Sequence, residues 1–145
     1  MKERIEWVCQ GVDMPEIDMT LTSRWIEQVA KAHGYIVGPI VYIFCDDRYI
    51  LDVNRRFLNH DYYTDIITFD YSRGKMISGD MFISLDTVNS NAEKLKVPYF
   101  QELNRVIIHG ILHLCGIDDK GPGEREIMEA NEDEALSLLQ STSSL

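Results

Sequence analysis

The 145-residue sequence has few cysteines and no long hydrophobic run, and both absences exclude classes of protein. Cys9, Cys45 and Cys115 are odd in number, far apart and surrounded by apolar residues, which is typical of reduced core thiols rather than of a disulfide framework or a cysteine zinc site. No apolar run approaches about 20 residues, so we expect no membrane-spanning helix. Residues 1–10 contain no apolar block ahead of a cleavage site, so we expect no secretory signal and a cytoplasmic protein.

Basic residues are also scarce, with 14 Lys and Arg against 24 Asp and Glu, for a net charge of −10. The excess is local: residues 118–134 hold eight acids and two bases, a net charge of −6, which leaves −4 for the rest of the chain. A polyanionic partner is therefore not excluded by the net charge, because steering depends on where charges lie. Eight of the twelve remaining cations form either a local basic strip or scattered solvated side chains: Arg48, Arg55, Arg56, Arg73, Lys75, Lys94, Lys96 and Arg105.

Hydrophobic periodicity and turn residues predict a single α+β domain over residues 1–145. We expect strands at 3–10, 39–45, 65–71 and 79–85, the last two joined by the short turn 72–75 as an antiparallel hairpin. The predicted helices begin at Thr20 or Thr22 (ending at Gly34), after Asp46 and Asp47, at Asp86 (through Lys96), at Pro98, and at Pro122 (through Leu139).

Two histidines in an apolar segment point to a metal ion. His109 and His113 lie four residues apart where we expect a buried helix. An α-helix advances about 100° per residue, so these two side chains share one face and can bind one ion. Gly116 favours a helix end, after which the chain could fold back and present Asp118 or Asp119. Three protein ligands and an open position are typical of a catalytic metal centre.

The chemistry of this centre stays open at the level of the residues. Two histidines in a buried helix are also compatible with hydrogen-bonded core residues. Imidazole ligands favour zinc, whereas a carboxylate ligand leaves iron or manganese as alternatives. The metalloprotease motif places a glutamate base after the first histidine, where this chain has Gly110. We expect metal-assisted hydrolysis with a phosphodiester as the plausible target, and keep a metallopeptidase and an iron oxygenase as alternatives.

Residues 109–119 (HGILHLCGIDD) resemble the signature H-G-x-L-H-L-x-G-[YF]-D-H of the YbeY family of bacterial rRNA maturation factors. Further blocks follow the family order, so that the resemblance covers about residues 52–132: Val53-Asn54, residues 64–69 (TDIITF), residues 79–84 (GDMFIS), Met128 and Glu132. The resemblance implies a small mixed β-sheet with about five helices around a central metal-bearing helix. It also implies a single-strand-specific endoribonuclease that acts in small-subunit (3′-end) rRNA maturation and ribosome quality control.

The resemblance also implies the ligands and partners. His109, His113 and Asp119 would be the catalytic metal ligands, with one Zn²⁺ per chain, although the family has a histidine where this chain has Asp119. The extra negative charge should make a water on the metal less acidic than in an all-histidine site. The implied partners are single-stranded RNA, precursor small-subunit rRNA, the ribosome and its assembly proteins, with no membrane or DNA partner.

A second departure concerns RNA binding, because Leu58 stands where the family has an arginine. Arg55, Arg56 or His60 could supply the missing charge at the phosphate. If none does, a non-catalytic ribosome-assembly factor becomes the alternative.

The remaining polar candidates have weaker support. Asp65 and Asp80 each begin a predicted strand, where an aspartate is usually a turn or cap residue. Glu132 is expected to pair or cap, or to orient a histidine ligand. Tyr62 and Tyr63 could stack on unpaired bases.

Overall fold

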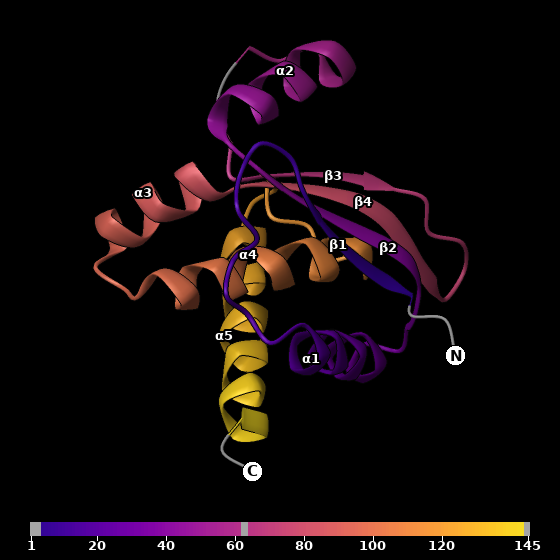
Figure 1. Ribbon diagram of the computed structural model, residues 1–145. Helices are drawn as coiled ribbons and strands as arrows, with labels where there is room; N and C mark the ends of the chain where they lie inside the picture. Colours follow the sequence, from indigo (N-terminus) through magenta and orange to yellow (C-terminus); the bar gives the residue numbers. More distant parts are fainter. Residues whose placement is uncertain (1–3, 62–63, 144–145) are drawn as a thin grey trace.

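A computed structural model of the chain describes residues 4–61 and 64–143, which form a four-stranded β-sheet with helices on both of its faces (Figure 1). The strands are β1 (Ile5–Cys9), β2 (Ile36–Cys45), β3 (Ile66–Asp70) and β4 (Met76–Ser84). The helices are α1 (Met19–Ala32), α2 (Asp47–Leu58), α3 (Leu85–Leu95), α4 (Tyr99–Leu114) and α5 (Glu124–Ser143). The predicted α+β class is confirmed, and so is the central position of the helix that carries both histidines.

The sheet is mixed, with the strand order β1-β2-β4-β3. β1 and β4 both run parallel to β2, whereas β3 runs antiparallel to β4, which confirms the predicted hairpin. Two strands begin three residues earlier than predicted, at Ile36 and Met76. Pro39 therefore lies inside β2, beside a register shift between Val37 and Ile40. Such an irregularity accommodates a residue that has no backbone N–H to donate.

Helix starts differ from the prediction where a local interaction decides them. The Asp18 side chain accepts a hydrogen bond from Leu21 N (3.0 Å), so α1 is capped by Asp18 and not by Thr20 or Thr22. The Thr22 hydroxyl instead donates to the Asp18 carbonyl at 2.7 Å. α5 begins at Glu124 rather than Pro122, because Gly123 has a left-handed φ of 76° that no α-helix contains.

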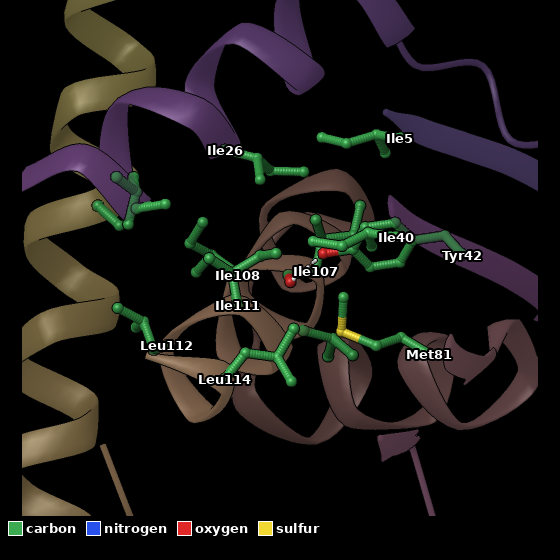
Figure 2. Close-up of a cluster of buried hydrophobic side chains, with 14 of the residues drawn as sticks. Ile5, Ile26, Ile40, Tyr42, Met81, Ile107, Ile108, Ile111, Leu112 and Leu114 are labelled. Carbon is green, nitrogen blue, oxygen red and sulfur yellow. Dashed lines mark hydrogen bonds between the residues drawn. The ribbon is translucent and has the colours of Figure 1, made fainter. Parts of the chain in front are cut away.

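The main core lies between the sheet and helices α1, α4 and α5 (Figure 2). Two buried aromatic side chains join these layers by hydrogen bonds: Tyr42 OH donates to the Ile107 carbonyl at 2.8 Å, and Trp25 Nε1 donates to the Ala135 carbonyl at 2.7 Å. Both bonds satisfy polar atoms that would otherwise be costly to bury. α4 is therefore held from the sheet side and α1 is held to α5.

All three cysteines are free thiols, as predicted, but only Cys45 and Cys115 are buried. Cys9 is exposed, contrary to expectation, because it ends β1, an edge strand. Among residues 4–61 and 64–143, no helix is both long and apolar enough to cross a membrane.

Gly110 allows α4 to approach the sheet closely. A Cβ atom at this position would lie 2.3 Å from Met81 Sδ on β4 and 3.0 Å from Ile66 Cδ1 on β3. Met81 is fully buried, so its side chain has little room to move away. The residue that follows the first histidine thus faces the core of the sheet.

We predict that Gly110→Ala lowers the free energy of unfolding. Overpacking costs about 1–3 kcal/mol, which outweighs the roughly 1 kcal/mol that alanine gains over glycine in a helix. The cost should largely disappear in a Met81→Ala background, where the sulfur atom is gone. Urea unfolding of the two single variants, the double variant and the parent protein measures this coupling. Equal effects of Gly110→Ala in both backgrounds would contradict the close contact.

Candidate functional site

The last two turns of α4 carry both histidines. His109 and His113 are one helical turn apart, and both are half-buried. α4 ends at Leu114, and the predicted stop residue Gly116 follows with a left-handed φ of 90°, while Ile117 N donates to the Leu112 carbonyl at 3.1 Å. The chain then turns back toward α4, which brings the following acidic residues near the first histidine.

Asp119 is the acid that reaches His109. The distance from His109 Nε2 to Asp119 Oδ2 is 3.4 Å. Asp118 is exposed, so of the two candidate acids the structure selects Asp119. This separation is longer than a usual N–H···O hydrogen bond of about 2.7–3.2 Å.

Glu132 on α5 binds the other ring nitrogen of His109. His109 Nδ1 lies 2.7 Å from Glu132 Oε2, and Arg105 Nη1 donates to Glu132 Oε1 at 2.9 Å. An ionised carboxylate only accepts, so Nδ1 carries a proton and donates to Glu132. The other ring nitrogen, Nε2, faces Asp119 and can bind a metal ion when it is unprotonated. Glu132 is 5% exposed, which makes both bonds largely sheltered from water.

The geometry of this pair fits a metal ion. Bonds of about 2.0–2.1 Å to nitrogen and oxygen in tetrahedral arrangement separate two ligand atoms by about 3.3 Å, close to the 3.4 Å between His109 Nε2 and Asp119 Oδ2. Metal-ligating histidines also commonly donate their second ring N–H to a carboxylate, as His109 does to Glu132. The donor atoms of His109 and Asp119 are thus suited to one divalent cation.

The third predicted ligand is not grouped with the other two. Across residues 4–61 and 64–143, no three His, Cys, Asp or Glu side chains are arranged to hold a metal ion. His113 shares the α4 face of His109 by its spacing, but it does not line the cleft that contains His109 and Asp119. The three-ligand centre therefore remains a prediction.

A cleft of about 710 Å³ opens beside His109, between α3, α4 and α5. Its lining consists of Asp65, Asn91, Lys94, Leu95, Val97, Glu102, Arg105, Val106, His109, Asp119, Arg125, Met128, Glu129, Glu132 and Asp133. Side chains that are far apart in the sequence thus share one concave surface, whose volume is within the range of ligand-binding clefts.

Charges around His109 favour its protonated form. Burial alone would lower the pKa of His109, but the hydrogen bond to Glu132 and the charges of Glu132, Asp119 and Asp65 outweigh burial and raise it. Burial raises the pKa of Asp65, although the nearby His109 opposes this shift. The Asp65 carboxyl, placed at the start of β3, is within 3.5 Å of Asn91 Nδ2. Asp65 is therefore part of the cleft and not only a turn residue.

The cations predicted to replace the family arginine lie elsewhere. Arg55 pairs with Asp61, and Arg56 pairs with Asp52 at 3.2 Å; both arginines are exposed on α2. α2 packs on the opposite side of the sheet from α4 (Figure 1), and neither Arg55, Arg56 nor His60 lines the cleft. Their contact with phosphate remains a prediction.

The remaining candidates from the sequence are Asp80, Tyr62 and Tyr63. Asp80 lies on β4 and accepts a hydrogen bond from Tyr71 OH at 3.3 Å, outside the cleft. Tyr62 and Tyr63 lie outside the described residues.

Glu102 is a cleft residue that the sequence reasoning missed. It is 4% exposed, and its Oε1 atom has no hydrogen-bond partner among the described residues. Burial raises the pKa of Glu102, Arg105 opposes this, and Asp65 and Glu132 add to it. The spacing Glu102, Arg105, His109 along one helix face could have shown that these side chains are neighbours.

Comparisons with known proteins support the sequence resemblance. The family model described as Endoribonuclease YbeY matches residues 11–140. A Phocaeicola vulgatus protein named Endoribonuclease YbeY is 64% identical over 135 residues, which are 93% of this chain and 98% of that protein. A Bacteroides thetaiotaomicron protein of the same name is 59% identical over 134 residues, covering 92% of this chain and 98% of that protein.

The fold also has a solved counterpart. A solution structure of a Thermotoga maritima protein superposes with a TM-score of 0.63 at 24% identity, covering 94% of this chain and 92% of the other. This likeness concerns the arrangement of helices and strands.

We predict that Glu102→Gln raises stability at neutral pH. A carboxyl whose pKa is raised on folding contributes stability below its ordinary pKa of about 4.3, and this contribution is lost as the pH rises through the raised value. At pH 8 the ionised carboxylate is buried, and the Arg105 Nε that pairs with it is 3.8 Å away, so burial outweighs the ion pair and glutamine should raise the free energy of unfolding by about 1 kcal/mol.

Urea unfolding of both proteins at pH 4.5 and pH 8 checks this expectation. The advantage of the glutamine variant should be larger at pH 8. A variant that is equally or more destabilised at pH 8 would show that ionised Glu102 stabilises the fold.

Proposed function

Because this chain belongs to the YbeY family and is an endoribonuclease of that family, we propose that it hydrolyses single-stranded RNA at a zinc centre formed by His109, His113 and Asp119. The observation that carries the proposal is the pair of contacts of one imidazole: Nδ1 lies 2.7 Å from Glu132, and Nε2 lies 3.4 Å from Asp119. One ring nitrogen thus contacts a carboxylate while the other faces Asp119, which supports a role for His109 as a metal ligand.

Each proposed ligand has a defined support. His109 is oriented by Glu132 and lines the cleft. Asp119 is brought to it by the helix end at Gly116. His113 would complete the set from the same helix face, because a spacing of four residues places two imidazoles one turn apart.

A divalent metal held by these residues would lower the pKa of a bound water and polarise a phosphoryl oxygen, which is the chemistry that phosphodiester hydrolysis needs. Two imidazoles and one carboxylate suit zinc, while iron and manganese bind similar sets. The protein's own contribution is to hold His109 in one orientation. Burial of Glu132 also limits competition by water for that hydrogen bond.

Position 110 argues against peptide hydrolysis by the metalloprotease arrangement. That arrangement needs a glutamate base directly after the first histidine. Here Gly110 faces Met81 and Ile66 in the core, so even a glutamate side chain there would be directed away from the cleft. The surroundings of α4 are therefore consistent with the nuclease function.

The proposed biological role is maturation of the 3′ end of small-subunit rRNA and ribosome quality control. The substrate would be precursor small-subunit rRNA in the cytoplasm. The protein would bind this RNA on the ribosome, together with ribosome-assembly proteins. The support for this biological role is membership of the family, whereas the support for RNA hydrolysis also includes the contacts of His109.

We predict about one zinc per chain in tag-free wild-type protein. Elemental analysis should show metal loss in His113→Ala and Asp119→Ala, and retention in Asp119→His, which restores an imidazole donor at the same place. Cleavage of a single-stranded RNA should follow metal content and stop after chelation. Full occupancy in either alanine variant, or undiminished cleavage after the metal is removed, would contradict the proposed ligand set.

We also predict that Glu132→Gln weakens metal binding by about 10- to 100-fold, because the amide holds the His109 Nδ1–H less strongly than a carboxylate does. Competition with a chromophoric chelator measures the metal affinity without reference to activity. Glu129→Gln is the matched control, since Glu129 lies on the same helix and pairs with Arg125 instead. Equal affinities of the two variants would show that Glu132 does not orient the ligand.

A further inference from the structure

The cleft beside His109 contains more carboxylates than cations. Six acidic side chains line it, and they are Asp65, Glu102, Asp119, Glu129, Glu132 and Asp133. Three cationic side chains, Lys94, Arg105 and Arg125, share the same surface. An RNA phosphate that enters this cleft is repelled at most places and attracted at few. The position of each available cation therefore decides where the RNA backbone can lie.

Arg105 is already engaged by protein carboxylates. Its Nη1 lies 2.9 Å from Glu132, its Nη2 lies 3.0 Å from Asp133, and its Nε lies 3.8 Å from Glu102. Its side chain is only 25% exposed. This guanidinium balances buried carboxylates, and moving it to a phosphate would leave Glu132 uncompensated.

Lys94 is the cleft cation that stays available. It lies in the last turn of α3, it is exposed, and it makes no ion pair within residues 4–61 and 64–143. Arg125 is the next most available, because its pairing with Glu129 at 3.0 Å joins two exposed side chains. Exposed pairs of this kind are worth roughly 0–1 kcal/mol and exchange readily for another anion.

An apolar surface adjoins Lys94 within the cleft. Leu95, the next residue, is 59% exposed although it is a large hydrophobic side chain. Val97, which is half-buried, extends the apolar lining beside Leu95, whereas Met128 is 2% exposed and offers almost no surface. A ribose or the flat face of a base could cover this surface while the adjoining phosphate contacts a cation.

We propose that Lys94 is the phosphate anchor of the RNA strand, which crosses the cleft between α3 and α5 with a nucleotide over Leu95 and Arg125 as a second, weaker contact. This inference rests on the proposed function, since it concerns the RNA that the metal centre would cleave. The ammonium group needs no fixed geometry to bind a phosphate oxygen and acts as a point charge. RNA binding by an acidic protein then depends on a local cation and not on the net charge.

Lys94→Gln tests the anchor by RNA binding. Fluorescence anisotropy of a labelled single-stranded RNA with the protein as purified should give a Kd raised roughly three- to tenfold at about 50 mM salt, and a salt slope reduced by about 0.7, as expected for one lost phosphate contact. Lys94→Arg should retain most of the affinity. Lys31→Gln is the matched control, because Lys31 is also exposed in the last turn of a helix but lies outside the cleft.

Kinetics separate binding from chemistry. With zinc added and the RNA concentration varied up to saturation, Lys94→Gln should raise KM with little change in kcat, because the proposed contact of Lys94 is with the strand away from the scissile bond. Leu95→Ala should weaken RNA binding without changing the salt slope, since it removes an apolar contact.

Two results would overturn the anchor: a Lys94→Gln protein that matches Lys31→Gln in Kd and salt slope, or a wild-type protein that binds no single-stranded RNA. Failure of the proposed metal chemistry looks different. In that case wild-type protein with zinc would bind RNA in a Lys94-dependent manner but would not cleave it, which supports the anchor and rejects the zinc centre.

Discussion

The carboxylate of Glu132 is the group on which the arrangement of the site depends. One of its oxygens binds Arg105 and the other binds His109, so a single buried side chain of α5 joins two turns of α4. A buried carboxylate costs several kcal/mol unless it is paired and hydrogen-bonded. Both conditions are met here, and the consequence is a histidine ring in one orientation, with the proton of Nδ1 directed to Glu132. The Asp119 side of that ring is then left for a ligand or an ion.

The acidic segment of residues 118–134 serves three purposes at once. Most of its acidic side chains are exposed, whereas Met128 packs into the core. Asp119 and Glu132 contact His109 from opposite ends of the segment. The same charge excess makes the cleft unfavourable for RNA at most points, which is why the placement of individual cations matters more than the net charge of −10.

Local sequence signals predicted the elements well and their limits less well. The antiparallel hairpin, the helix end at Gly116 and the buried character of α4 follow from short-range patterns of apolar, turn and glycine residues. The errors occur where a neighbouring group competes: Asp18 takes the cap that Thr20 or Thr22 was expected to provide, and β2 continues through Pro39. The helix start depends on which side chain caps the first turn, and the strand start depends on a register shift around Pro39. Hydrophobic periodicity measures neither of these.

The sequence by itself determined the family, the helix that presents His109 and His113, and the two acids that could follow them, because these features depend on helical spacing and on one glycine turn. Only the tertiary structure decided that Asp119 and not Asp118 reaches His109. It also decided that Glu132, 23 residues later in the chain, has its carboxylate 2.7 Å from His109 Nδ1. The need for glycine at position 110 likewise comes from the approach of Met81 on the sheet. The tertiary structure also placed Lys94 in the cleft and Arg55 outside it. The reason is physical: contacts between distant residues are set by how α3, α4, α5 and the sheet pack together, and many different packings are compatible with the same local periodicity.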